Sequence, residues 1–524
     1  MYDLLIKNGR IYNGNSSVSY ISDIGIKDDK IVRIDNLSNK QSREIIDASN
    51  LSIMPGFIDT HCHSDIALLY DKQHINALYQ GITTEILGQD GLSYAPLSID
   101  KLKMYVKFNA GLNGYFEEVN LDFTDVESYL SKFHNKASVN VAYQIPHGAI
   151  RLEVLGFIDI PLHGYHLEKA KDLIRSGFDQ GAVAFSTGLS YFPQSYSDTE
   201  ELTELSKVCV EYNAPFVIHL RSVFRDRFFN PVEEAIEVAR RSGVRLHFSH
   251  FRTDDKNCGN VTELLKPIEK AIEEGLNITM ELYPYYSGSG YAVCFLPPWV
   301  VEGGYEATLE KLKNPLLRKR ITDGMKANKI TTEGTFTHLK ENKKYIGIDF
   351  KDVAKKRNQS VEDMICDVMI EEDLEVGFRG NPTINKEKIN QMDKDFICLL
   401  SRPYYMVGTD GIPIGLKPHP RAFGSFPKIL KLAKQYGMSY EILSNRTSFL
   451  PAKTFNLKNR GAIEKNYIAD IVIFDPENVK DNATYKDPRR PPDGIEYVIV
   501  NGKIAVFKGK ATGLFAGKSI KRGQ

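Results

Sequence analysis

Two histidines separated by one residue, His61 and His63, are the first side chains whose types and spacing could do chemistry. They end the segment GFIDTHCH, which is apolar before them and begins at the Pro55-Gly56 pair. On a β-strand, residues two apart point to the same face and lie about 6–7 Å apart. Two imidazoles at that spacing can bind one divalent metal ion, and the apolar strand before them favours this over a surface pair.

Two further histidines each close an apolar segment elsewhere in the chain. His219 ends the apolar part of PFVIHL, and His250 ends RLHFSH. A single histidine at a strand end is more often structural than a metal ligand, but two more at equivalent positions favour a shared site. His247 competes with His250 for this role. It lies three residues earlier, which places it deeper and on the opposite side of the strand, so we favour His250.

One carboxylate follows the last apolar segment, YYMVGTD. Asp410 stands there next to Gly411, which lets the chain turn sharply. A carboxylate in this position could ligate a metal weakly and also move protons. It could equally cap the helix that follows, because aspartate is a common N-cap residue. The position alone leaves both interpretations open.

All of these residues stand at the carboxyl ends of short apolar segments. Eight such segments alternate with amphipathic stretches, for example EELTELSKVCVEYN and NPVEEAIEVARRSG, which predicts parallel βαβ units. The eight segments are GFIDTHCH, TTEILG, SVNVAYQI, GAVAFSTG, PFVIHL, RLHFSH, NITMELYP and YYMVGTD. Eight units close an α/β fold of the (β/α)₈ TIM-barrel type, whose active sites lie at the carboxyl ends of the strands. We therefore expect the histidines and Asp410 to lie together at the mouth of the barrel, where the strands end.

The two ends of the chain resemble each other. YDLLIKNGRIYNG predicts a hairpin with its turn at Asn8 and Gly9, and EYVIVNGKIAVFKG predicts one around Asn501 and Gly502. Each hairpin alone would expose an apolar face with nothing to cover it. We therefore expect the two ends to pair in one small β-sandwich.

The domain limits follow from these segments. We expect a discontinuous β-sandwich domain of residues 1–54 and 450–524, and a catalytic barrel of residues 55–449. The stretch between ELYPYY and YYMVGTD is too long for one helix and loop. Residues at about 290–395 must therefore form an insertion, which we expect to act as a lid or sub-domain over the site. The stretch YKDPRRPPDG, before the second hairpin, indicates an exposed loop.

The amino-acid composition narrows the classes of partner that the protein is expected to bind. The 524 residues carry 67 basic and 67 acidic side chains, and this balance indicates neither nucleic acid nor an anionic membrane surface as a partner. The start lacks a signal-peptide pattern, and no apolar run approaches the roughly 20 residues that span a bilayer. Six cysteines without a CxxC pair argue against a disulfide framework. We expect a cytoplasmic protein with a small-molecule substrate, and a homo-oligomer stays open. Cys62 should pack in the core, on the face opposite the two histidines.

The ordered set of motifs resembles the amidohydrolase superfamily and, within it, the N-acyl-D-amino-acid deacylases, or D-aminoacylases. The resemblance runs nearly from end to end and is more specific for the family than for the substrate. The motifs are PGFIDTHCHSD, GITTEILGQDGLSYAPL, NVAYQIPHGAIR, GAVAFSTGLSYFP, VIHLRS, HFSHFR, ELYPYYSGSG, FLPPW, VGTDG, HPRAFGSF, LPAKTF and the tail ADIVIFDP with YVIVNGK.

This resemblance implies roles for the residues above. His61 and His63 match the metal ligands of the first strand, and His219 and His250 match those after strands five and six. Asp410 matches the catalytic aspartate after strand eight, which resolves the ambiguity of its position. The implied enzyme hydrolyses the amide bond of N-acyl-D-amino acids to a carboxylate and a free D-amino acid. The D preference rests on the resemblance alone.

One position departs from the family pattern. Where well-known members carry a ligating cysteine in a Gly-Asn-Cys-Gly turn, this chain reads Gly88-Gln89-Asp90-Gly91. Asp90 is still a ligand candidate, and its carboxylate could bridge two ions. Oxygen in place of a thiolate should weaken the preference for Zn²⁺ over Mn²⁺ or Co²⁺. We expect a divalent metal, with Zn²⁺ as the first choice, Mn²⁺ or Co²⁺ as alternatives, and one or two ions.

A substrate α-carboxylate needs a cationic anchor. Arg252 lies two residues after His250 on the same face, where family members place a basic residue, and it could hold the carboxylate through two hydrogen bonds. Tyr283 and Ser289, in ELYPYYSGSG, could add hydrogen bonds, and Tyr191, in STGLSYFP, could line the pocket. Such residues at strand ends often only pack, and this alternative stays open.

The expected mechanism is hydrolysis with Asp410 as general base and then general acid. A divalent ion would polarise the carbonyl and acidify water, while Asp410 would take the water's proton and deliver it to the leaving amine. The alternative is a cyclic-amide hydrolase of the hydantoinase or dihydroorotase type, or another amidohydrolase reaction on the same barrel. The lack of a strand-end lysine suited to bridge two ions argues against the cyclic-amide type. The acyl group and the preferred side chain are not specified by the sequence.

Overall fold

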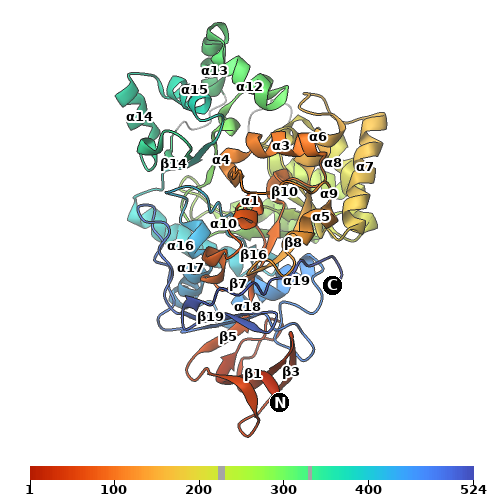
Figure 1. Cartoon of the computed structure of the whole chain (residues 1–524), viewed down its shortest axis with the longest axis vertical. Coiled ribbons are helices and arrows are strands. Elements are labelled where there is room, and N and C mark those ends of the chain that lie inside the picture. The colour runs from red at the N-terminus through yellow and green to blue at the C-terminus, as the bar shows by residue number, and fades with distance from the viewer. Residues whose placement is uncertain (222–229, 328–332) are drawn as a thin grey trace.

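The computed structural model describes residues 1–221, 230–327 and 333–524, and an eight-stranded parallel sheet forms its centre (Figure 1). Each strand is one of the eight segments expected from the sequence, so the predicted barrel is confirmed. In chain order the strands are β6 (Phe57–Asp59), β7 (Ile82–Leu87), β8 (Asn140–Pro146), β9 (Ala184–Gly188), β10 (Pro215–His219), β11 (Arg245–Phe248), β12 (Ile278–Leu282) and β16 (Tyr405–Val407).

The strands are short and apolar because both of their faces are covered. All residues of β7, β8 and β9 are buried, since one face fills the barrel and the other lies under helices. The helices that cover the outside of the barrel include α7 (Gly164–Asp179), α8 (Thr199–Glu211), α9 (Pro231–Ser242), α10 (Val261–Glu273), α16 (Lys386–Leu400) and α17 (Arg421–Tyr436). The sequence predicted α8 and α9. Asn230 caps the start of α9, and Gly243, at φ 77°, ends it.

Shorter helices connect the barrel strands. They are α1 (Asp65–Tyr70), α2 (Ile75–Leu78), α3 (Ile99–Phe108), α4 (Ala110–Asn113), α5 (Val126–Ser131), α6 (His147–Val154), α18 (Tyr440–Ser444) and α19 (Leu450–Thr454). The barrel is nearly closed. Within the described ranges no ladder joins β6 to β16, and the segments that follow these two strands are joined by a bridge between Cys62 and Gly411.

Both ends of the chain form one mixed sheet at the bottom of Figure 1. Its strands are β1 (Tyr2–Ile11), β2 (Tyr20–Lys27), β3 (Lys30–Asp35), β4 (Ser42–Asp47), β5 (Ser52–Pro55), β17 (Ile471–Phe474), β18 (Ile495–Val500), β19 (Lys503–Phe507) and β20 (Lys510–Ala511). The antiparallel pair of β5 with β17 joins the two ends, as the sequence predicted. The limits 1–54, 450–524 and 55–449 are not decided by these strands and stay predictions.

The two Asn-Gly pairs behave differently. Asn501 and Gly502 make the turn between β18 and β19, as predicted. The hairpin predicted at Asn8 and Gly9 is wrong: β1 runs through both residues and pairs with β2, with a shift of register at this point. Asn8, at φ 62°, forms a bulge, and its unpaired amide donates to Oδ1 of Asp23 at 2.9 Å.

An insertion separates β12 from β16 and lies at the top of Figure 1. It contains a three-stranded sheet of β13 (Ser289–Tyr291), β15 (Val376–Arg379) and β14 (Thr335–Leu339). Its helices are α11 (Pro298–Val301), α12 (Gly304–Lys313), α13 (Pro315–Ala327), α14 (Phe350–Arg357) and α15 (Val361–Glu371). Because α12 contacts α3, which follows β7, the insertion lies on the side where the barrel strands end.

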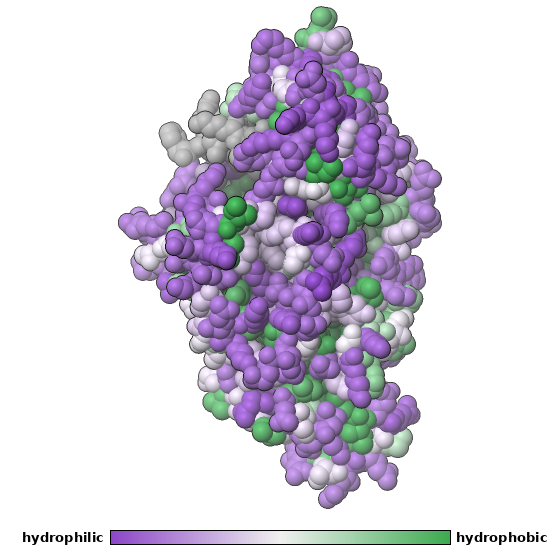
Figure 2. Space-filling view, turned by 90° about the vertical axis from the view of Figure 1, so that its left-hand side faces the viewer, coloured by the Kyte–Doolittle hydropathy of each residue, from purple (hydrophilic) through white to green (hydrophobic). Residues whose placement is uncertain are grey.

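The face shown in Figure 2 is mainly hydrophilic, with hydrophobic residues in small scattered groups. Single apolar residues are ordinary on a protein surface. Among the described helices, none is both long and apolar enough to cross a lipid bilayer.

Candidate metal centre

Four histidines and two aspartates meet where the barrel strands end. They are His61 and His63 after β6, Asp90 in the short turn η1 (Gln89–Gly91) after β7, His219 at the end of β10, His250 after β11 and Asp410 after β16. Every ligand and base expected from the sequence is therefore in one place. Cys62 points elsewhere. It is buried, and its Sγ lies 3.8 Å from the carbonyl oxygen of Ile86, consistent with core packing.

Asp90 lies between two pairs of histidines. Its Oδ2 is 3.6 Å from Nε2 of His61 and 3.7 Å from Nε2 of His63. The same oxygen is 3.5 Å from Nδ1 of His219, and that nitrogen is 2.7 Å from Nε2 of His250. One carboxylate thus reaches both pairs.

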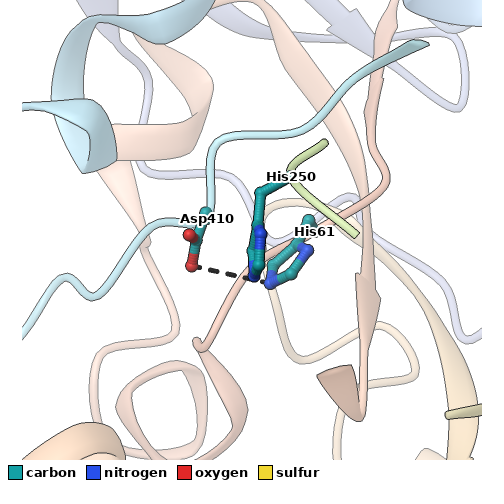
Figure 3. Close-up of side chains that lie close together, drawn as sticks. All are labelled: His61, His250 and Asp410. Carbon is teal, nitrogen blue, oxygen red and sulfur yellow. Dashed lines mark ion pairs between the residues drawn. The ribbon is translucent and has the colours of Figure 1, made fainter. Parts of the chain in front are cut away.

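Asp410 also faces the first pair, His61 and His63. Its Oδ1 is 3.5 Å from Nε2 of His61 and 3.3 Å from Nε2 of His63. Figure 3 shows Asp410, His61 and His250 directed toward one another, with the first two joined as an ion pair. The other carboxylate oxygen, Oδ2, lies 2.7 Å from Nη1 of Arg421. Asp410 therefore has one oxygen toward the cluster and one held by a cation.

These side chains fit a divalent metal ion. Within the described ranges, Nε2 of His61 and Oδ1 of Asp90 are buried without a hydrogen-bond partner, which costs about 1–3 kcal/mol per atom unless a ligand is bound. The ligand atoms of His61, His63 and Asp90 lie within 4.8 Å of one another, and so do those of Asp90, His219 and His250. Imidazole and carboxylate suit Zn²⁺, Mn²⁺ and Co²⁺. The residues could hold one ion on each side of Asp90.

Burial and charge set the protonation of the cluster. Burial, followed by the neighbouring ring of His219, lowers the pKa of His250 to about 4, so this ring is neutral, as a metal ligand must be. Burial alone would raise the pKa of Asp410, but Arg421 and His61 outweigh it and hold that pKa below its ordinary value. His61 and His219 do the same for Asp90. Both carboxylates are therefore ionised at neutral pH.

Glu281, on β12, fixes two of the histidines, and the sequence reasoning missed it. Its Oε1 accepts from Nδ1 of His61 at 2.8 Å and from the backbone N–H of His250 at 2.7 Å. Because Nδ1 of His61 donates there, Nε2 is left as the ligand atom. His247 also binds Glu281 and lies outside the cluster, as expected. The sequence feature that could have identified Glu281 is its acidic side chain in the ELYP motif, near the end of a barrel strand.

The turn that carries Asp90 is held by one side chain of β9 and one from the segment that follows it. Asp90 has a left-handed backbone, with φ 55°, which aspartate tolerates better than most residues. Nε2 of Gln194 donates to the carbonyl oxygen of Asp90 at 2.9 Å, and Ser186 donates to the carbonyl of Gly88. The position of the Asp90 carboxylate is thus set by its backbone.

Asp59 and Thr409 connect β6 to the loop after β16, where the barrel lacks a ladder. Oδ1 of Asp59 accepts from the backbone N–H of Thr409 at 2.8 Å and of His61 at 3.2 Å, and Oδ2 accepts from the Thr409 hydroxyl at 2.6 Å. The backbone N–H of Asp410 donates to the carbonyl of His61 at 2.7 Å. These bonds fix Asp410 relative to His61.

We expect Thr409→Val to lower kcat by about 10- to 100-fold, the usual effect of losing a hydrogen bond that orients a metal site. The change keeps the shape of the side chain but removes the donor to Asp59. Thr60→Val is the matched control, because that buried hydroxyl donates only to the carbonyl of Val407, at 3.2 Å, and its loss should change kcat less than about threefold. Thr409→Ser should restore activity. Equal losses in both valine variants would show that the Asp59 contact has no special role.

Two arginines lie beside this cluster around one tyrosine ring. The guanidinium of Arg252 lies 4.3 Å from the ring centre of Tyr283, and its Nη2 is 3.1 Å from the Tyr283 hydroxyl oxygen. Arg421 lies 4.5 Å from the same ring centre and was missed as a site residue, although it stands in the HPRAFGSF motif. The structure thus offers two cations at one tyrosine ring, and one of them, Arg421, is paired with Asp410.

The other two substrate candidates also lie at the mouth. Nη2 of Arg421 donates to the carbonyl oxygen of Ser289 at 3.3 Å, while the Ser289 hydroxyl donates to the carbonyl of Phe378 at 2.7 Å. The ring of Tyr191 lies 4.8 Å from that of His219. Tyr191 therefore contacts the cluster, whereas the hydroxyl of Ser289 is engaged with the insertion.

Comparison with known proteins finds relatives in the family that the sequence motifs resemble. Residues 306–505 match the model of the Amidohydrolase family. The whole chain is similar to D-aminoacylase of Alcaligenes xylosoxydans xylosoxydans, with 28% identity over 534 residues that cover 99% of this chain and 98% of the relative.

Solved structures extend the similarity to three dimensions. A D-aminoacylase structure described for its binuclear metal centre has a TM-score of 0.81 and 25% identity, and the match covers all of both chains. An N-acyl-D-glutamate deacylase of Bordetella bronchiseptica, in complex with zinc and a phosphonate inhibitor, has a TM-score of 0.80 and 25% identity over 99% of each chain. The likeness includes the terminal sheet and the insertion as well as the barrel.

Proposed function

Because this chain belongs to the D-aminoacylase family of the amidohydrolase superfamily, we propose that it hydrolyses N-acyl-D-amino acids to a carboxylate and a free D-amino acid. The observation that carries the proposal is the buried cluster of four histidines and two aspartates, with two arginines beside it. The substrate is a small molecule. The cytoplasmic location and a homo-oligomer expected from the sequence stay predictions.

We propose that the four histidines and Asp90 hold the metal, with Zn²⁺ as the first choice and Mn²⁺ or Co²⁺ as alternatives. A bound divalent ion polarises a substrate carbonyl and lowers the pKa of water toward neutrality. Hydrogen bonds from Glu281 and within the η1 turn hold these ligands in place.

Asp410 is the proposed general base. It is ionised, and its Oδ1 faces His61 and His63, so a water molecule bound beside these two rings would lie within reach of this oxygen. Its Oδ2 is held by Arg421, which fixes the direction of the free oxygen. Asp410 can accept a proton from the attacking water and return it to the leaving nitrogen of the amine.

Arg252 and Arg421 are the proposed anchors for the α-carboxylate of the substrate. Neither the side chain of Arg252 nor that of Tyr283 has a carboxylate partner within the described ranges, and they hydrogen-bond to each other. Two guanidinium groups and a phenol can bind one carboxylate through several charge-assisted hydrogen bonds. We propose that Tyr191 and Ser289 form walls of the same pocket.

The test is a substrate panel with purified enzyme of known metal content. We expect turnover of N-acetyl-D-amino acids such as N-acetyl-D-methionine, slower turnover of the L enantiomers, and little turnover of dihydrouracil. Equal or faster hydrolysis of the L enantiomers would remove the D assignment. Hydrolysis of dihydrouracil alone would favour a cyclic-amide hydrolase. Treatment with a chelator, followed by restoration with metal, separates metal-dependent turnover from a contaminant.

A further inference from the structure

A segment of the terminal sheet reaches the mouth of the barrel. Residues 481–489, here called the strap, lie between β17 and β18. The exposed loop predicted for YKDPRRPPDG is confirmed for most of its residues, which are exposed and form neither helix nor strand. Tyr485 is an exception, because its ring packs against that of His419, with 5.0 Å between the ring centres. Further along the strap, Arg489 donates to the carbonyl of Pro413 at 2.9 Å. The strap therefore lies on the loop that follows β16.

The strap also holds the loop between β12 and β13, which carries Tyr283. The hydroxyl of Tyr285 donates to Asp481 at 3.1 Å, and the backbone N–H of Tyr286 donates to the hydroxyl oxygen of Tyr485 at 3.1 Å. Both loops that flank the proposed carboxylate pocket are thus tied to one segment from the terminal sheet.

A chain of hydrogen bonds runs from the strap to Arg421. The backbone N–H of Arg421 donates to Nδ1 of His419 at 3.1 Å, so the ring carries its proton on Nε2. Burial, followed by the guanidinium groups of Arg421 and Arg379, holds the pKa of His419 well below its ordinary value and keeps the ring neutral. Nε2 of His419 is 3.1 Å from Oγ of Ser287, and that hydroxyl donates to Tyr485 at 3.3 Å.

We propose that Tyr485 is a positioning residue for the carboxylate side of the site, acting through Ser287 and His419 on the loops that carry Tyr283 and Arg421. The inference rests on the proposed function, because it concerns recognition of the substrate's α-carboxylate. The Tyr485 hydroxyl accepts two hydrogen bonds, and without it a backbone N–H and a serine hydroxyl lose their acceptor. Since Tyr485 makes no contact with the metal-binding cluster, its loss should act on binding more than on chemistry.

The kinetic test compares Tyr485→Phe with Tyr404→Phe. Tyr404 is a matched control. It lies just before β16, at the end of that strand opposite the site, and its hydroxyl donates to Glu269 at 2.8 Å. We expect Tyr485→Phe to raise KM for N-acetyl-D-methionine about 10-fold, with kcat within about threefold and the metal content unchanged. Tyr404→Phe should leave all three quantities within about twofold.

Two further readouts separate recognition from general damage. The preference of the enzyme for the free carboxylate over its methyl ester, measured as the ratio of kcat/KM, should fall about 10-fold in Tyr485→Phe. Hydrogen exchange in the peptide that contains Tyr286 should become about 10-fold faster, whatever the substrate is. Unchanged exchange, or equal losses on acid and ester, would overturn the inference. A wild-type enzyme that hydrolyses neither enantiomer would instead refute the proposed function, while the exchange experiment would still test the strap.

Discussion

The Asp410→Asn variant should turn over N-acyl-D-amino acids about 10²- to 10⁴-fold more slowly than the wild type, the usual contribution of a general base. Asparagine has the same shape and can still accept a hydrogen bond from Arg421, but it cannot take a proton from water. The loss should appear in kcat, with the metal content unchanged. Steady-state kinetics together with elemental analysis of the same preparation measures both.

Asp254→Asn is the control for this variant. Asp254 is exposed on the loop after β11, close in sequence to the mouth, and it accepts only from backbone groups of that loop. Its replacement should leave kcat unchanged within about twofold. Full activity of Asp410→Asn would disprove its assignment as the base. Loss of bound metal in that variant would show that Asp410 acts as a ligand instead.

Removing the carboxylate of Asp90 should have the second large effect. Because one oxygen of Asp90 lies within 3.7 Å of three histidine nitrogens, Asp90→Ala should reduce the number of tightly bound ions and lower activity by at least about 100-fold. Titration with Mn²⁺, Co²⁺ and Zn²⁺, followed by elemental analysis, gives the number of ions per chain. A variant that binds as many ions as the wild type, with equal affinity, would exclude Asp90 as a bridge.

The Asp90→Cys variant tests the type of ligand. A thiolate is softer than a carboxylate, so this variant should prefer Zn²⁺ over Mn²⁺ more strongly than the wild type does. With Co²⁺ bound, it should also gain a sulfur-to-metal absorption band, which does not depend on turnover. Cys62 serves as an internal control, because the wild type already carries its buried thiol beside the ligands. Identical metal preferences in the two proteins would refute the argument from ligand softness.

The barrel could be predicted because its strands are buried on both faces. Segments such as Ile82–Leu87 are short, continuous and apolar, and this pattern does not depend on distant contacts. The histidines could be predicted for the same reason, since the carboxyl ends of all barrel strands meet at one mouth. Asp410 was ambiguous by position, because a helix cap and a base both need a carboxylate after a strand.

The residues that were missed act through contacts between distant parts of the chain. Arg421 touches Asp410 only because the loop after β16 folds back, and Tyr485 reaches Ser287 across almost 200 residues of sequence. No local pattern specifies such pairs. The wrong hairpin at Asn8 has the opposite cause: the local turn signal was real, but Asp23, on the neighbouring strand, stabilises a bulge at that residue instead.

The pairing of β5 with β17 makes catalysis depend on both termini. β5 leads into β6 through Gly56 alone, and β6 ends two residues before His61. A truncation that removes residues 471–524 would therefore leave β5, the strand that leads to the first ligand, without its partner β17. A fusion tag at either end must therefore leave the pairing of β5 with β17 intact.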